Sequence, residues 1–315
     1  MWRRFQFFHK EEIKIPRSEV ECKQSFDVDQ TCADSGRGYL VMGDSSGMVH
    51  CIRSGFRWSS FRAYQGLVSH VHHLQSRNTL VTVGSDGGDE ARLVLKVWEL
   101  EIPVESGEPP QPVAPTPLFK AAKATEKTAG GLPVVEVKAG DSKAAEEVTC
   151  LRSSEDLRFI AVGLSNGATV LFRGEIMGGD HRKFVRTKLS PLQSTAPVTG
   201  LFFQHIPGSR SVLFSISTNA VSTHRLADGV VDGGDESEVL DSARGAELGC
   251  CAQSMIGDVL VGREEAIFPY MYDGDICSPA GFFSFEGEKK QLMSFNGYLL
   301  VVGASCICKH AQFIV

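Results

Sequence analysis

The hydrophobic and polar positions of this chain form one unit that recurs along its length. In residues 158–172 (RFIAVGLSNGATVLF), an apolar run at 159–162 meets a glycine and a short polar turn, and a second β-rich run follows at 169–172. The Asn166-Gly167 pair in the turn is a strong hairpin signal, because both residues tolerate positive φ angles. The unit is therefore predicted to be a β-hairpin.

Similar units recur before and after this hairpin. Four of the five intervals between them lie between 41 and 54 residues, and the fifth, of 79 residues, contains a low-complexity insertion. A period of about 40–45 residues with several strands per unit is typical of a β-propeller. The residues that end the first strand of each hairpin are Gly43, Gly84, Gly163, Ser217, Gly262 and Gly303.

The sequence thus predicts an all-β, WD40-like β-propeller with six countable hairpins. Residues 97–100 (VWEL) stand where the last strand of a WD-type unit would fall. No unit carries the full Gly-His…Trp-Asp signature, so the repeats are degenerate. We expect propeller blades in residues 1–100 and again in residues 148–315, with residues 101–147 as an insertion between them.

The insertion differs from the rest of the chain in composition. Six prolines fall between positions 103 and 117, and runs of Ala, Lys and Glu follow. Such a segment buries too little apolar area to offset its ordering entropy, so most of residues 101–147 is predicted to be disordered. Leu118 and Phe119 are assigned either to the last strand of the second blade or to the outer strand of the next one.

The N-terminal residues 2–8 (WRRFQFF) are short and aromatic. We interpret them as a strand that could pair with the last blade, and a membrane-surface anchor is the alternative, although the segment is too short for a stable interfacial helix. Residues 9–31 read as a loop. The N-terminus lacks the apolar stretch of a secretory signal, and no apolar run approaches the roughly 18–20 residues that span a bilayer.

Composition narrows the function classes without selecting one. The chain has 315 residues, 42% of them hydrophobic, and a formal net charge of −6, so bulk charge does not favour nucleic-acid binding. Its nine cysteines have no regular spacing. An odd count without a secretory signal indicates a reducing compartment. Cys250 and Cys251 cannot both face one side of a strand, so we expect the pair to be half buried.

Candidate chemistry is sparse. His70 and His72 would share one face of a strand, with His73 beside them, and could suit a metal, although no third ligand is evident and surface positions of a blade are the favoured interpretation. The C-terminal group resembles half a zinc site, but packing on a terminal strand explains it as well. That group consists of Cys306, Cys308 and His310.

Two acidic loops lack the register of a calcium loop and are interpreted as solvated turns. They contain Asp86, Asp89 and Glu90, and Asp232, Asp235, Glu236 and Glu238. The glycine cluster at residues 43–47 lacks the lysine of a phosphate-binding loop and is interpreted as a hairpin turn. No Gly-x-Ser-x-Gly elbow is present. We therefore predict no catalytic, cofactor-binding or metal-binding residues and no enzymatic activity.

An ordered set of short motifs resembles the N-terminal part of the family of the eleventh vacuolar protein sorting subunit. No single motif is decisive, but in order and spacing the set covers residues 2–303 apart from the insertion. The motifs are WRRF at 2–5, DSGRG at 34–38, LVMGD at 40–44, FRAY at 61–64, LKVWEL at 95–100, FIAVG at 159–163, RGEI at 173–176, PVTGL at 197–201 and GYLLVV at 297–302.

The resemblance implies a scaffold in the class C tethering complexes, HOPS and CORVET. Family members have an N-terminal propeller, an α-solenoid and a C-terminal RING-type domain, and the assembled complexes bind Rab-type GTPases and support SNARE-driven fusion. It implies a cytoplasmic protein, peripheral on late endosome, vacuole or lysosome membranes. Against a seven-bladed ring, the six countable blades leave the propeller incomplete, and the solenoid and RING domain are not found in this sequence.

Two other functions remain open from the sequence. One is an unrelated propeller adaptor, such as a substrate receptor in ubiquitin ligation, which would bind a peptide on its central face. The other is a propeller enzyme with a metal in its central channel, which would need acidic or histidine side chains from several blades directed at one axis.

Overall fold

The structure of this chain is a computed structural model. It describes residues 29–36, 38–53, 58–74, 76, 78–86, 92–100, 117–120, 135–136, 147–174, 185–190, 195–205, 210–227, 236–272, 277–279, 281–295, 298–303 and 312–313. The regular elements in these ranges are β-strands, which form six antiparallel sheets. The all-β prediction is therefore confirmed.

The six sheets follow one another along the chain as six blades. Blade 1 contains β1 (Gln30–Gly36), β2 (Tyr39–Asp44), β3 (Met48–Arg53) and β4 (Trp58–Arg62). Blade 2 contains β5 (Val68–His73), β6 (Thr79–Asp86), β7 (Arg92–Glu99), β8 (Pro117–Lys120) and β9 (Val135–Glu136). Blade 3 contains β10 (Val148–Ser153), β11 (Phe159–Leu164), β12 (Thr169–Arg173) and β13 (Val185–Leu189).

The second half of the chain repeats the arrangement. Blade 4 contains β14 (Val198–Gln204), β15 (Ser211–Ser217), β16 (Val221–Leu226) and β17 (Glu236–Asp241). Blade 5 contains β18 (Cys251–Gln253), β19 (Val259–Gly262), β20 (Ala266–Tyr272), β21 (Cys277–Pro279) and β22 (Phe283–Ser284). Blade 6 contains β23 (Lys289–Phe295), β24 (Tyr298–Gly303) and β25 (Gln312–Phe313).

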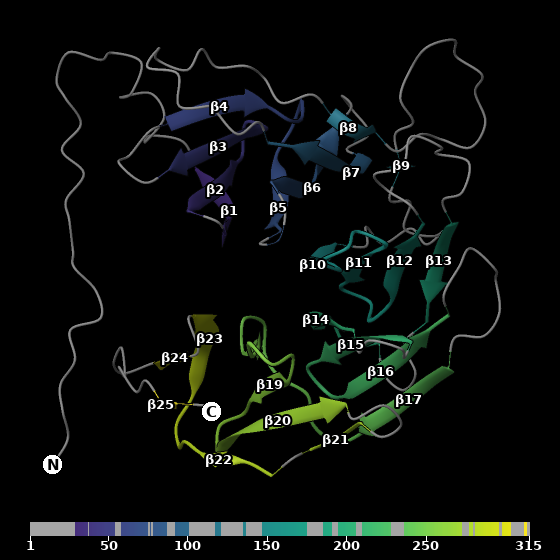
Figure 1. Cartoon of the computed structure of the whole chain (residues 1–315), viewed down its shortest axis with the longest axis vertical. Helices are drawn as coiled ribbons and strands as arrows, with labels where there is room; N and C mark the ends of the chain where they lie inside the picture. Colours follow the sequence, from purple (N-terminus) through teal and green to yellow (C-terminus); the bar gives the residue numbers. More distant parts are fainter. Residues whose placement is uncertain are drawn as a thin grey trace, which may run out of the picture.

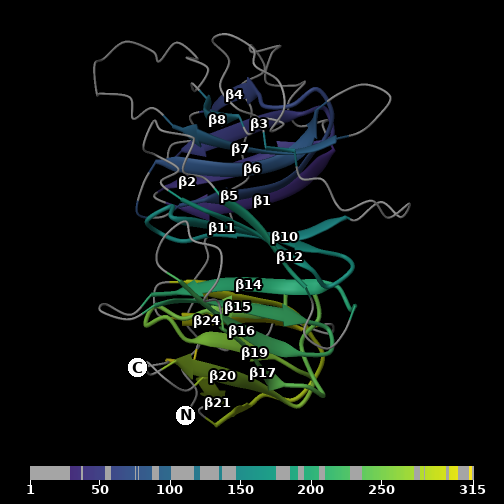
Figure 2. The same ribbon diagram turned by 90° about the vertical axis from the view of Figure 1, so that its right-hand side faces the viewer.

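The blades are arranged around a common centre, with the first strand of each blade innermost (Figure 1). The side view places blades 1 to 3 in one half of the molecule and blades 4 to 6 in the other (Figure 2). In the described part of the chain, blades 1 and 6 are the two ends of this arc (Figure 1). None of the described elements is a helix long and apolar enough to cross a membrane.

Among the described residues, the hydrophobic core is divided into five clusters, one at each junction between consecutive blades. At the junction of blades 1 and 2, Val41 and Phe61 pack with Leu80 and Trp98. The other four clusters join blades 2 and 3, 3 and 4, 4 and 5, and 5 and 6. Strands that are buried on both faces explain the near-continuous apolar runs of the second strands, such as residues 159–164.

The template hairpin is formed by β11 and β12, as predicted, but its turn differs from the expected type. Only the glycine of the Asn166-Gly167 pair has positive φ (+82°). The Gly167 N–H donates to the Leu164 carbonyl (3.1 Å), and the Asn166 side chain accepts a hydrogen bond from the Ala168 N–H (3.0 Å). Asn166 therefore shapes the turn through its side chain and not through a left-handed backbone.

The innermost strands β1, β5, β10, β14 and β23 share a bulge near their first residues. In β1, β10 and β14 a threonine lies at the bulge. The hydroxyl of Thr149 donates to the Val198 carbonyl (2.6 Å), and that of Thr199 donates to the Ala246 carbonyl (2.7 Å). Thr31 likewise donates to Val68. Each hydroxyl thus joins its blade to the start of the next one.

Several sequence predictions can be compared with these elements. β8 pairs with β7, so Leu118 and Phe119 belong to the last strand of the second blade. Trp98 lies on β7, which is third from the centre and not the last strand, because β8 lies outside it. Beyond β8, the described residues of the insertion are 135–136 (β9), which pair with β7, and Glu147. Its other residues and residues 1–28, including the predicted N-terminal strand, lie outside the described residues.

Leu157 is the non-glycine residue with positive φ (+59°) in the described chain, and its side chain is 1% exposed. The equivalent turn of blade 5 has Gly257 with φ of +100°. A left-handed conformation costs a non-glycine residue about 1–2 kcal/mol. Burial in the core between blades 2 and 3 therefore outweighs this strain.

We predict an unusual order of stabilities at this position. Leu157→Ala should lose about 2–5 kcal/mol of unfolding free energy. Leu157→Gly should lose no more unfolding free energy than Leu157→Ala, because glycine also removes the backbone strain. At the equally buried strand residue Leu171, glycine should be worse than alanine by about 1 kcal/mol. Urea denaturation of the four variants checks this, and the same order at both positions would contradict it.

Candidate functional site

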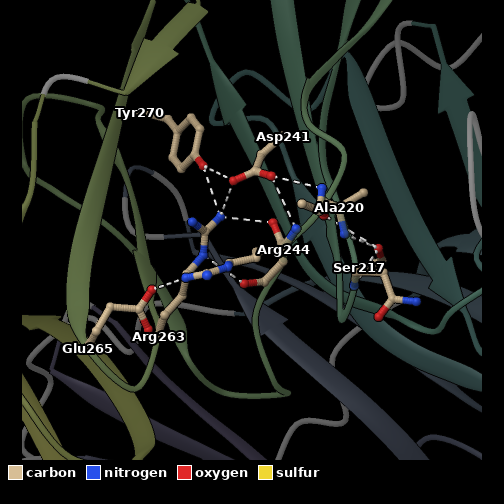
Figure 3. Close-up of polar contacts among 10 residues, drawn as sticks. Ser217, Ala220, Asp241, Arg244, Arg263, Glu265 and Tyr270 are labelled. Carbon is tan, nitrogen blue, oxygen red and sulfur yellow. Dashed lines mark hydrogen bonds and ion pairs between the residues drawn. The ribbon is translucent and has the colours of Figure 1, made fainter.

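The largest polar network described joins blades 4 and 5 (Figure 3). Asp241 ends β17, and Arg263 follows β19 in the next blade. The Arg263 guanidinium donates to Asp241 Oδ2 (2.8 Å), to the Arg244 carbonyl (2.8 Å) and to the Tyr270 hydroxyl (3.1 Å). It also donates through Nε to the Gly245 carbonyl (3.2 Å). One side chain therefore holds the strand end, the connecting loop and the next blade together.

The carboxylate of Asp241 is held from two sides. Its Oδ1 accepts hydrogen bonds from the N–H groups of Ala243 (3.0 Å) and Arg244 (3.1 Å). Burial alone would raise the pKa of Asp241, but these hydrogen bonds and the Arg263 charge outweigh it, and the pKa lies below its usual value. The network therefore provides no candidate acid or base, because the carboxylate stays ionised and fully bonded.

A second network joins blade 2 to the connection that precedes it. The indole N–H of Trp98 donates to Thr82 Oγ1 (2.9 Å), and the Tyr64 hydroxyl lies 2.7 Å from the same oxygen. Lys96 forms an ion pair with Asp86, donates to the Ala63 carbonyl (2.6 Å) and lies 4.3 Å from the centre of the Tyr64 ring. Burial raises the pKa of Tyr64 well above its usual value, so its phenol stays protonated.

Blade 1 holds a buried Asp–His–Ser series. His50 Nε2 lies 2.9 Å from Asp44 Oδ2, and His50 Nδ1 lies 2.8 Å from Ser60 Oγ. Blade 4 repeats the last contact, with His224 Nδ1 2.7 Å from Ser237 Oγ. In both blades the histidine bridges the third and fourth strands. The same histidine–serine contact at corresponding places in two blades indicates a structural role, in which it ties the outer strand to the rest of the sheet.

The innermost strands decide whether the centre could hold a metal. The residues three positions after the bulged residue in β1, β5, β10, β14 and β23 correspond to one another. These corresponding residues form one layer around the centre. The layer contains one acid, one histidine and one arginine beside apolar residues, and such a mixture does not form a set of metal ligands. These residues are Asp34, His72, Arg152, Phe202 and Met293.

Within this layer, Asp34 joins blades 1 and 2. Its Oδ2 lies 3.0 Å from His72 Nδ1 and accepts a hydrogen bond from the His73 N–H (2.8 Å). Burial would raise the pKa of Asp34, but the hydrogen bonds from His72 and the backbone outweigh it and hold the pKa below its usual value. Burial lowers the pKa of His72 despite the Asp34 carboxylate. His72 is therefore a neutral donor near neutral pH.

This pair predicts that stability decreases on acidification. A histidine whose folded pKa is lowered stabilises the protein above its unfolded pKa, near 6.5, and that contribution is lost as the pH falls through the folded pKa. His72→Asn keeps a donor near Asp34 and removes the titration. It should flatten the dependence of unfolding free energy on pH between pH 7 and 5, relative to the unsubstituted protein. Equal slopes in the two proteins would contradict the prediction.

The metal candidates from the sequence do not assemble. No group of three or more His, Cys, Asp or Glu side chains suited to a metal occurs among the described residues. His72 is bonded to Asp34, and His73 is buried, so the expected surface positions for this histidine group were wrong. His70, on the same innermost strand, is half buried. Cys306, Cys308 and His310 lie outside the described residues.

The acidic loops and the glycine cluster have structural roles where they are described. Asp86 pairs with Lys96, and Glu236 lies 3.6 Å from Arg225 on the neighbouring strand. Glu238 lies on β17, whereas Asp89, Glu90, Asp232 and Asp235 lie outside the described residues. Residues 43–47 form the hairpin between β2 and β3, as predicted, and Gly47 has φ of +89°.

The described cysteines are poor nucleophiles. Burial raises the pKa of Cys51 and of Cys150 to about 12 and raises those of Cys32, Cys250 and Cys251. All five are free thiols. Cys250 is buried and Cys251 is half buried at the start of β18, in accord with the expectation for this pair.

Sequence reasoning missed the Arg263 network altogether. Arg263 and Asp241 are 22 residues apart and belong to different blades. No local motif pairs them, and only the register of blades 4 and 5 brings them together. The available signal was positional: Asp241 follows a strand and precedes a connection, where a carboxylate commonly binds backbone N–H groups.

The fold and its polar networks define a structural β-propeller. Two solved structures share the fold. The β-propeller domain of Cps50 (Swd1) from Myceliophteria thermophila matches with a TM-score of 0.51 and 13% identity, over 88% of this chain and 81% of that one. The computationally designed Ika8 protein matches with a TM-score of 0.52 and 14% identity, over 86% of this chain and 67% of that one.

The chain belongs to the PEP5/VPS11 N-terminal family, which matches residues 2–312. It is 31% identical over 308 residues to the vacuolar protein sorting-associated protein 11 homolog of Dictyostelium discoideum, covering 96% of this chain and 28% of that protein. The Homo sapiens homolog is 31% identical over 318 residues, covering 96% and 30%. The Arabidopsis thaliana homolog is 28% identical over 305 residues, covering 95% and 29%.

The family assignment confirms the resemblance and the expectation of a structural, non-enzymatic protein. The chain spans less than a third of the length of the relatives it matches. The activity and partners of those longer proteins are therefore matters for proposal.

Proposed function

We propose that this chain is a propeller scaffold of a HOPS- or CORVET-type tethering complex that acts in endosome-to-vacuole or lysosome trafficking and fusion. The observation that carries the proposal is the family match over residues 2–312. The junction networks support it, because they fix the blades rigidly and leave the connecting loops free to vary. A rigid surface with variable loops suits protein–protein contact.

The proposed partners are the other class C vacuolar protein sorting subunits, with Rab-type GTPases and SNAREs reached through the assembled complex. The chain would then be cytoplasmic and peripheral on late endosome, vacuole or lysosome membranes. A formal net charge of −6 disfavours direct attraction to anionic lipids, so membrane association would depend on partners.

Affinity purification of this chain from cells, beside a version extended to the length of the relatives, tests the proposal. Recovery of class C subunits with the 315-residue chain would place an assembly contact on the propeller. Recovery only with the extended version would place the assembly contacts outside the 315-residue chain and would still support membership in the tethering complex. Recovery with neither, from protein shown to be folded, would overturn the proposal and favour an unrelated adaptor.

A further inference from the structure

The turn between β18 and β19 exposes two adjacent large apolar side chains. Met255 is 76% exposed and Ile256 is 70% exposed. Scattered apolar residues are normal on protein surfaces, but two neighbours at the tip of a tight turn form a compact apolar knob. We call these two residues the Met255–Ile256 knob.

The fold itself does not require apolar residues at this place. Blade 3 has a similar turn, one residue longer, in which Ser154 Oγ accepts a hydrogen bond from the Phe159 N–H (3.0 Å) and the tip residues are Glu155 and Asp156. In blade 5, Ser254 Oγ accepts from the Asp258 N–H (3.0 Å). Acidic tip residues in one turn and apolar tip residues in the other indicate that the knob has a role beyond forming the turn.

The knob is held in a fixed conformation. The Ser254 N–H donates to the Asp258 carbonyl (2.8 Å), and the Gly257 N–H donates to the Ser254 carbonyl (3.1 Å). The Gln253 side chain donates to the Gly257 carbonyl (3.1 Å) and to the Phe203 carbonyl of blade 4 (2.9 Å). A preorganised turn loses little conformational entropy when a partner binds.

Two acceptors beside the knob lack donors among the described residues. The Asp258 carboxylate is half buried, and burial raises its pKa without any compensating charge. The amide oxygen of Gln204, whose side chain packs against Gly257, is buried and accepts no hydrogen bond from the described residues. A lysine or arginine of a binding partner would supply the positive charge and the hydrogen-bond donors for the Asp258 carboxylate.

We propose that the Met255–Ile256 knob docks into an apolar groove of a protein partner that carries a lysine or arginine for Asp258. A membrane is the disfavoured occupant, because the Asp258 carboxylate would be repelled by anionic lipid. This inference stands apart from membership in a tethering complex, since any groove of this chemistry would fit.

Site-specific photo-crosslinking tests the proposal. A photoreactive methionine analogue at position 255 of the extended chain, expressed in cells, should crosslink to a protein segment that contains apolar residues and a lysine or arginine. Ile256→Glu and Asp258→Lys should each reduce that crosslink roughly tenfold or more. Changing the partner's basic residue to glutamate should restore it in the Asp258→Lys chain.

The matched control is Leu248, which is 60% exposed in the loop before blade 5. Leu248→Glu should leave the crosslink from position 255 unchanged. Asp258→Asn, which keeps the shape of the side chain, should also weaken the crosslink, and an unchanged thermal midpoint of each variant shows that the fold is retained. Crosslinking to lipid, no crosslink, or a crosslink insensitive to both changes at Asp258 would overturn the proposal.

Discussion

Replacing Arg263 by methionine should lower the free energy of unfolding by roughly 2–4 kcal/mol. The substitution removes the donor of four polar contacts at the junction of blades 4 and 5 and leaves the Asp241 carboxylate without its cation. Because the two side chains are only 10% and 24% exposed, water replaces these contacts poorly. Urea denaturation followed by tryptophan fluorescence or circular dichroism measures the loss.

The neighbouring arginine provides a matched control. Arg244 pairs with Glu265, and both side chains are largely exposed. Exposed pairs of this kind contribute about 0–1 kcal/mol, so Arg244→Met should have little effect. If the two substitutions destabilised the protein equally, the Arg263 network would not be the connection that holds blades 4 and 5.

Gly163→Ala should lower the unfolding free energy by about 2–3 kcal/mol. A Cβ atom at this position would lie 2.5 Å from Cys150 Sγ and 2.8 Å from Val198 Cγ1, where blade 3 packs on the innermost strand of blade 4. Neither neighbour can move far, because Thr149 beside Cys150 is bonded to the Val198 carbonyl. The expected result is a lower urea midpoint with an unchanged denaturant slope.

Gly66→Ala is the control for this substitution. Its backbone does not require positive φ, and the nearest atom to an added Cβ is Ser85 Cβ at 3.2 Å. A small adjustment accommodates that contact, so we expect a change within about 1 kcal/mol. A tolerated alanine at position 163 would show that close approach between blades does not explain the glycine there.

The glycines that revealed the repeat in the sequence have a common physical cause. Gly43, Gly84, Gly163 and Gly262 lie near the ends of second strands, where a neighbouring blade or a connection between blades comes within 3 Å of the place that a Cβ atom would occupy. Periodicity and glycine spacing therefore predicted the six blades, because each blade must meet the same steric condition.

Ser217 shows why one repeat was harder to find. Blade 4 has serine where the other blades have glycine, and the close approach has moved to the connecting loop, where an added Cβ on Gly245 would clash with the Ser217 carbonyl oxygen. A glycine displaced by 28 positions cannot be recognised from spacing alone. The steric requirement is preserved while its sequence signal is lost.

The polar networks were not predictable, for a related reason. Each depends on residues from different strands or blades, as with Tyr64 and Trp98 around Thr82. Trp98 could be recognised in the sequence as part of a WD-type unit. Its partners in the network could not, because a tyrosine and a lysine complete the network here. Leu157 was equally hidden, because only its burial reveals why a leucine is kept in a left-handed turn.

The division of the core into five junction clusters has a consequence for signalling through the protein. Each cluster joins consecutive blades, so the described blades form a linear series of nearest-neighbour contacts. A perturbation at one blade must cross every intervening junction to reach a distant one, and its energetic effect should fade with each crossing. Partners bound to distant blades of such a scaffold would then bind independently. The propeller would hold them apart without coupling the binding of one to the binding of the other.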